Sequence, residues 1–338
     1  MNKTVIAIID SGIDKSFITN NIKSVIKLTE EEYQDLSGHG TMCFNFINKY
    51  CFESEFIIIK ILDRFGTCKS DILIQAFEML LNLEVNVIHL SAAVTVNVRK
   101  EIKDRLLVIC KQLNFQNKII VCSQANGRQD PVIPAGFPLV IGVEGTHMNS
   151  IKEYYFDNER TIQGLADSTP ILLPSGGGRI DFFSGNSKAA AIITIEIVKY
   201  MEKDSSYTYQ KVLNALECNR LHNSWDYGVI QVKNNSYIES CEKYMDNLLK
   251  QSIVNKKRLN RLKLEFALFF FKKPRFVHSF FIKKEYKKTK KNFSYMKDIS
   301  RFVSYYTLKY SIHINMDEIS IFDFINVYSL YNILYKTR

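Results

Sequence analysis

The chain has 338 residues, 46% of them hydrophobic, which is enough to bury a core in one large domain with an appendage or in two domains. It lacks an apolar run of the roughly 18 residues that a membrane span needs, and no signal-peptide cleavage pattern follows its first apolar run, so we expect a cytoplasmic protein. The seven cysteines show no CxxC spacing, which argues against a disulfide framework and a zinc site, and we expect no metal and no cofactor.

Charge divides the chain into two parts. Residues 1–250 contain 26 Lys and Arg against 29 Asp and Glu, a net charge of −3, whereas residues 251–338 contain 19 against 6, a net charge of +13. We therefore predict a first domain over residues 1–250 and a basic C-terminal domain over residues 251–338.

The first part alternates between two kinds of apolar pattern. Runs nearly continuous in Val, Ile and Leu, typical of strands covered on both faces, occupy residues 4–9, 56–62, 85–90, 118–123 and 138–143. Residues 70–82 and 98–113 have the apolar spacing of three and four that indicates helices. This alternation predicts a doubly wound, mostly parallel α/β sheet with helices on both faces, and its functional residues should follow the strands.

Three polar motifs stand at such positions. Asp10 ends the first strand in a DSGID turn, His39 stands between two glycines in SGHGT before a helix-like segment, and Ser187 stands in GNSKAAA at the start of another helix. Alone, the first motif is also compatible with a plain turn and the last with a helix cap. Together, a carboxylate, an imidazole and a hydroxyl in this order are typical of a catalytic triad.

An oxyanion donor would complete such a site. Asn126 follows the strand at residues 118–123, where its amide is expected to pair with the backbone N–H of Ser187. His89 lies inside an apolar strand, and we interpret it as a core residue.

With these motifs, residues 1–245 resemble the subtilisin-like serine peptidases, the subtilases. The segments that follow His39 in the same order as in that family are residues 59–80, 87–93, 132–145, 209–217 and 225–234. The resemblance implies a triad of Asp10, His39 and Ser187 with Asn126 in the oxyanion hole.

The resemblance also implies how a peptide substrate is bound. An edge strand at Leu90, Ser91 and Ala92 would add backbone hydrogen bonds to an extended peptide. The pocket for the side chain before the scissile bond would be lined by Ser123, Gln124 and Ala125, a more polar set than is usual in the family, which implies a selective enzyme.

The chain departs from the family pattern around the serine. Asn186 replaces Thr, Lys188 replaces Met and Ala191 replaces Pro. We favour a solvated Lys188 at the helix surface over one that points inward, and we expect Cys43 and Cys68 to be buried structural thiols.

Two functions follow from these observations. The first is a serine endopeptidase that processes selected peptides, for example by removing a leader from a ribosomally made peptide. The alternative is a catalytically weak or silent subtilase-like protein that binds peptides within a maturation complex.

Residues 256–297 combine fifteen Lys and Arg with ten aromatic residues and two acidic ones. Such a segment can bind single-stranded nucleic acid, lie on an anionic membrane surface, or form a small helical domain with an aromatic core. We favour the helical domain, and nucleic acid is the least favoured partner. The basic surface would also attract an acidic leader peptide.

Overall fold

The computed structural model describes residues 3–92, 99–126, 130–146, 148, 153–204, 206–220, 255–271, 292–314, 319 and 327–335. These residues fall into two compact units. The first consists of residues 1–169, 175–177 and 183–230, and the second of residues 170–174, 178–182 and 231–338. The predicted domain boundary near residue 250 lies outside the described residues.

The first unit is built on an eight-stranded sheet with the strand order β2-β3-β1-β4-β5-β6-β8-β7. Its strands are β1 (Val5–Asp10), β2 (Ile22–Lys27), β3 (Glu55–Lys60), β4 (Val87–Leu90), β5 (Ile119–Ser123), β6 (Ile141–Thr146), β7 (Tyr154–Phe156) and β8 (Gly164–Asp167). β7 is antiparallel to β8, and the other pairs are parallel. The prediction of a doubly wound, mostly parallel α/β sheet is confirmed.

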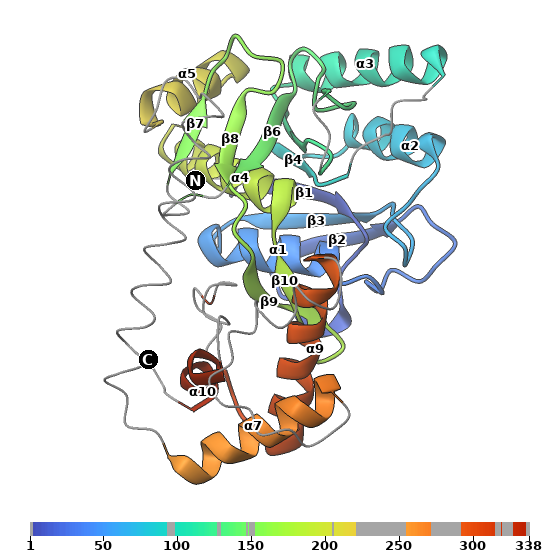
Figure 1. Cartoon of the computed structure of the whole chain (residues 1–338). Helices are drawn as coiled ribbons and strands as arrows, with labels where there is room; N and C mark the ends of the chain where they lie inside the picture. The colour runs from blue at the N-terminus through green and yellow to red at the C-terminus, as the bar shows by residue number, and fades with distance from the viewer. Residues whose placement is uncertain are drawn as a thin grey trace. The chain divides into compact units, whose positions relative to one another are not determined.

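Helices cover both faces of this sheet (Figure 1). α2 (Ser70–Leu80) and α3 (Lys100–Phe115) pack against each other and share a core with Ala7 and Ile9 of β1. α1 (His39–Tyr50) and α4 (Gly185–Lys203) pack together on the other face, where α4 crosses β5, β6 and β8 and contacts α5 (Tyr209–Asn219). Because every residue of β1 is buried, its continuous apolar sequence is explained by cover on both sides.

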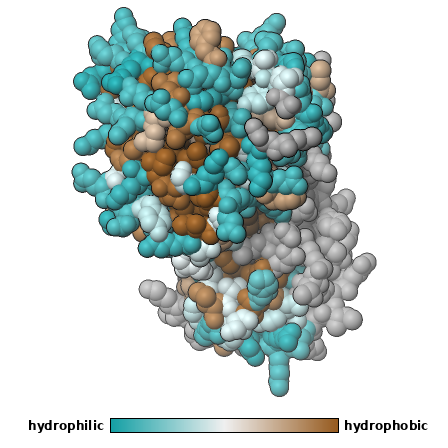
Figure 2. Space-filling view, turned by 180° about the vertical axis from the view of Figure 1, so that it is seen from behind, coloured by the Kyte–Doolittle hydropathy of each residue, from teal (hydrophilic) through white to brown (hydrophobic). Residues whose placement is uncertain are grey.

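On the face drawn in Figure 2, hydrophilic residues form most of the outer surface of the first unit, and they surround a group of apolar residues near its middle. No helix within the described ranges has both the length and the apolar character to cross a membrane.

The second unit combines parts of the hairpin β9 (Ile171–Gly176) and β10 (Arg179–Phe183) with α7 (Lys256–Phe271), α9 (Asn292–Tyr310) and α10 (Val327–Tyr335). Phe266 of α7 and Phe302 of α9 stack edge to face with ring centroids 5.1 Å apart, within a core that includes Leu172, Tyr306 and Leu330. Aromatic residues of the basic segment thus form a helical core, as the favoured interpretation predicts. Residues 272–291 of that segment lie outside the described residues, and a membrane or leader-peptide partner stays a prediction.

Candidate active site

Asp10 and His39 form a hydrogen-bonded pair at the carboxyl end of β1. Asp10 is the last residue of β1, and His39 is the first residue of α1. His39 Nδ1 lies 2.9 Å from both carboxylate oxygens of Asp10. The carboxylate is fully buried, whereas 34% of the His39 side chain is exposed. The carboxylate therefore orients the ring through Nδ1 and leaves Nε2 on the opposite edge of the ring.

The pair stabilises its own charges. Burial alone would lower the pKa of His39, but the Asp10 carboxylate raises it well above the usual value. Burial alone would also raise the pKa of Asp10, but His39 and hydrogen bonds from Ser11 lower it below its usual value. Asp10 is therefore suited to stabilise an imidazolium, the state that His39 must reach after accepting a proton.

The glycines around the pair are required by close backbone approach. Gly12 has a φ of +104°, and a Cβ added there would lie 2.4 Å from the carbonyl oxygen of Tyr33. A Cβ on Gly40 would lie 2.4 Å from the carbonyl oxygen of Gly12. The backbone N–H of Gly40 donates to Ser11 Oγ over 2.9 Å. These contacts explain why DSG and HGT occur together, since the start of α1 lies directly on the turn after β1.

Asp35 fixes the loop that carries His39, and our sequence reasoning missed it. This side chain is 2% exposed and accepts five hydrogen bonds. One oxygen accepts from Ser37 N, Ser37 Oγ and Gly38 N, and the other accepts from Thr41 N and Thr41 Oγ1. No capping pattern marks it in the sequence, because Asp35 stands three residues before Gly38, the N-cap of α1.

The turn before α4 presents Ser187. Gly185 has a φ of +71°, and a Cβ there would lie 2.7 Å from Asn126 Oδ1. That oxygen accepts the backbone N–H of Asn186 over 3.0 Å. Ser187 is the third residue of α4 and is 7% exposed, while Asn126 is exposed. Asn126 thus lies beside the first turn of α4, and its amide is oriented by the backbone N–H of Asn186.

Phe183 brings the His39 ring to the chain segment that carries Ser187. Phe183 lies four residues before Ser187, and its ring centroid is 6.1 Å from that of His39 in an edge-to-face arrangement. It also packs against Phe46 of α1, with centroids 5.5 Å apart. With the packing of α1 on α4, these contacts place the Asp10–His39 pair and the turn that carries Ser187 in one region.

The solvated position favoured for Lys188 is wrong. Its side chain is completely buried, and Nζ pairs with the carboxylate of Asp167 and donates to the carbonyl oxygen of Thr169 over 2.9 Å. The physical reason is that α4 crosses the sheet and nearly all of its first turns are covered, so no solvated face exists at this position.

Some of the residues predicted to bind the peptide are instead paired within the sheet or hydrogen-bonded inside the protein. β4 lies between β1 and β5, so the prediction of an edge strand is wrong, and Leu90 is paired on both sides with Ile9 and Cys122. Ser91 and Ala92 lie beyond the last paired residue and are half-buried. Ser91 Oγ bonds His89, whose burial lowers its pKa to about 4, in keeping with a core residue.

In the predicted side-chain pocket, Ser123 and Gln124 are buried and Ala125 is half-buried. The Gln124 amide donates to the carbonyl oxygen of residue 130 and accepts the N–H of Val132. Its polar groups therefore hold a neighbouring segment of backbone instead of facing a substrate.

Cys43 lies beneath the Asp10–His39 pair. Its Sγ is 3.6 Å from Asp10 Oδ2 and 3.8 Å from His39 Nδ1, and burial raises its pKa to about 11. These three side chains have ligand atoms within 4.8 Å of one another, as a metal site would. The 2.9 Å contacts and the protonated thiol fit a hydrogen-bonded cluster better than a metal, which requires a thiolate. Cys68, which was expected to be buried, is exposed in the turn after β3.

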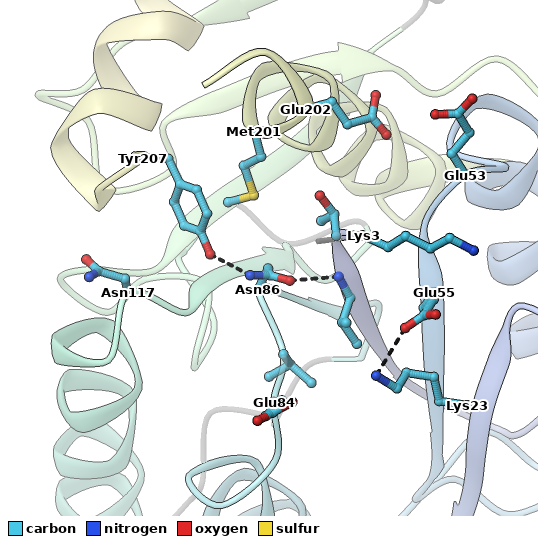
Figure 3. Close-up of a pocket in the computed structure, with 13 residues that line it drawn as sticks. Lys3, Lys23, Glu53, Glu55, Glu84, Asn86, Asn117, Met201, Glu202 and Tyr207 are labelled. Atoms are coloured by element: carbon cyan, nitrogen blue, oxygen red, sulfur yellow. Dashed lines mark hydrogen bonds and ion pairs between the residues drawn. The ribbon is translucent and has the colours of Figure 1, made fainter. Parts of the chain in front are cut away.

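A hollow of about 1070 Å³ lies at the opposite, amino end of the strands (Figure 3). Residues near the starts of β1, β3 and β4 line it, among them Val5, Glu55 and Asn86. Asn86 accepts the N–H of Val5 and donates to Tyr207, and Lys23 pairs with Glu55 across 3.0 Å. These polar groups satisfy one another, and in parallel sheets of this kind chemistry is found at the carboxyl ends, so the hollow is separate from the candidate site.

Comparisons with known proteins agree with the fold. No family model matches the chain, and no curated protein matches its sequence. Among solved structures, the chain is similar to a lanthipeptide protease, with a TM-score of 0.54 and 16% identity over 66% of this chain and 81% of that one. It is also similar to a cold-adapted subtilisin-like serine proteinase, with a TM-score of 0.51 and 15% identity over 64% and 81%. The chain thus shares the fold of subtilisin-like proteases.

Proposed function

We propose that this protein is a serine endopeptidase in which His39 deprotonates Ser187, Asp10 orients His39, and Asn126 stabilises the oxyanion. The observation that supports it most is the buried Asp10–His39 pair, with Nδ1 2.9 Å from the carboxylate at a strand's carboxyl end. A serine hydroxyl needs such a base, because it is a weak nucleophile near neutral pH.

In the proposed reaction, the Ser187 hydroxyl attacks the peptide carbonyl as its proton passes to His39 Nε2. The negative charge that develops on the carbonyl oxygen is stabilised by the Asn126 amide and the backbone N–H of Ser187. His39 then donates the proton to the leaving amine, and water releases the acyl group by the same steps.

We also propose that the substrate is a peptide or protein segment bound in extended form. Ser91 and Ala92 continue β4 beyond its last paired residue, so their backbone groups are suited to pair with a substrate strand. The fold shared with a lanthipeptide protease supports a role in peptide maturation, and we propose that this role is the removal of a leader peptide in the cytoplasm.

The silent peptide-binding alternative is motivated by departures from the family pattern, among them those at Asn186 and Lys188. In the structure both side chains are buried and hydrogen-bonded next to the turn that carries Ser187. The departures are therefore accommodated without loss of the turn, which favours the enzyme.

A fluorophosphonate probe tests the proposal. The wild-type protein should be labelled, and Ser187→Ala should abolish labelling because the attacking oxygen is gone. Ser70→Ala is the matched control, since Ser70 also lies at a helix start, that of α2, and should leave labelling unchanged. Labelling of Ser187→Ala at the wild-type rate would refute the assignment, and a wild type that binds peptides without being labelled would favour the silent alternative.

A further inference from the structure

Asp167 and the two residues after it hold one side of the nucleophile turn. Asp167 ends β8 and is 4% exposed. One carboxylate oxygen pairs with Lys188 Nζ, and the other accepts from Met148 N at 3.0 Å, Thr169 N at 3.0 Å and Thr169 Oγ1 at 2.6 Å. The backbone N–H of Gly185 donates to the carbonyl oxygen of Ser168 over 3.1 Å. The segment 167–169 is thus bonded to Gly185 and Lys188, on either side of Ser187.

Asn186 holds the other side. Its Oδ1 accepts the N–H of Gly145 in β6 at 2.8 Å, and its Nδ2 donates to the carbonyl oxygen of Gln124 after β5 at 2.9 Å. Its own N–H donates to Asn126. Ser187 is therefore flanked by two side chains that reach the ends of β5, β6 and β8.

A buried ion pair is not explained by stability alone. Taking both charges out of water costs free energy that their attraction only partly returns, and apolar residues of similar volume often stabilise a protein as well or better. Burial lowers the pKa of Lys188, and Asp167 opposes that effect. The pair instead fixes the orientation of the Lys188 side chain, because Nζ bonds both a carboxylate and a carbonyl oxygen at fixed positions.

We propose that Lys188 and Asp167 form a positioning pair that fixes the first turn of α4, so that Ser187 and the Asn126 amide keep their reactive geometry. This inference rests on the proposed function. Neither residue touches the reacting atoms, and both act through the backbone on each side of Ser187. A displacement of the attacking oxygen by about 1 Å is enough to reduce a rate about 100-fold.

The test measures the rate of phosphonylation at increasing probe concentrations, which gives a limiting rate and a half-saturating concentration. The urea midpoint of unfolding is measured on the same variants. Lys188→Met should lower the limiting rate about 10- to 100-fold and leave the half-saturating concentration within about twofold. The double variant Lys188→Met/Asp167→Asn removes both charges, so it should regain stability, but the limiting rate should stay low because the directional bonds are still missing.

Lys118→Met is the matched control. Lys118 is 8% exposed and donates to the carbonyl oxygens of Leu80 and Leu81, at the amino end of β5. Its replacement should lower the urea midpoint and leave the limiting rate unchanged. If Lys188→Met does not fold, Asp167→Asn alone, which keeps an oxygen for Met148 and Thr169, should still lower the limiting rate.

The outcomes separate the two proposals. A labelled wild type with Lys188→Met and Asp167→Asn labelled at the same limiting rate would overturn the positioning pair and leave the peptidase intact. A wild type that is not labelled at all would overturn both.

Discussion

The replacement of Asp35 by Asn tests whether the loop before α1 is fixed by one carboxylate. Both oxygens of Asp35 accept backbone N–H groups, from Ser37 and Gly38 on one side and from Thr41 on the other. An amide has only one oxygen, so either orientation leaves at least one backbone N–H facing an NH₂ group. Because Thr41 is buried, water does not replace the missing acceptor.

The expected loss of stability follows from these bonds. A buried donor without an acceptor costs about 2 kcal/mol, and loss of the charge weakens the remaining bonds by about 1 kcal/mol. With a denaturant dependence of about 2 kcal/mol per M, a total of about 3 kcal/mol lowers the urea midpoint by about 1.5 M. His39 begins at the end of this loop, so the phosphonylation rate of the folded variant should also fall.

Asp63→Asn is the matched control for this experiment. Asp63 also accepts two backbone N–H groups and a threonine hydroxyl, but both N–H groups bond the same oxygen and the turn is exposed. An amide keeps that oxygen, so the midpoint should move little. A shift below about 0.3 M for Asp35→Asn would contradict the reasoning, as would equal shifts for the two variants.

Two further predictions concern the groups proposed to be catalytic. Since Asp10 raises the pKa of His39, phosphonylation should rise with pH as the imidazolium loses its proton, with a half-point above the usual value of about 6.5. Asp10→Asn should move the half-point to lower pH and reduce the plateau about 10⁴-fold, and an unmoved half-point in a pH–rate profile would contradict the pairing. Asn126→Ala should lower kcat for a peptide substrate about 100- to 1000-fold with a smaller change in KM, and a change confined to KM would remove Asn126 from the oxyanion hole.

The sequence predicted those parts of the fold in which burial leaves a strong pattern. The central strands β1, β3, β4 and β5 are continuous apolar runs because helices cover both faces, and each was predicted within a few residues. β2 was missed because most of its residues are half-buried at the sheet edge, where polar residues are tolerated. β8 was missed because GLAD is short and its burial comes from α4, which is distant in sequence.

In the candidate site, too, the residues in patterned motifs were predicted, and those whose partners are distant in sequence were not. Asp10 and His39 were predicted to interact, and they do, because their motifs contain the glycines that allow the turn and the helix start to touch. Asp35 was not predicted, since a carboxylate that holds a loop has the same sequence appearance as any loop Asp. Lys188 was placed in solvent, because no pattern within α4 reveals that Asp167, 21 residues earlier, is there to receive its charge.

In the sequence, Asn186 and Lys188 are departures from the family motif, because a motif contains only the residues of the turn itself and not their partners. The structure gives each a partner outside the motif. Gly145 leaves room for Asn186, since a Cβ there would lie 3.1 Å from Asn186 Oδ1 and 2.6 Å from Ser168 Cβ, and Asp167 supplies the charge that Lys188 needs. A turn with Thr and Met in these positions would lose the bonds to Gly145 and Gln124 and leave the Asp167 carboxylate without its cation. The residues beside Ser187 therefore have to be considered together with the strand ends that they contact. Asn186 and Lys188 each match the groups at those strand ends.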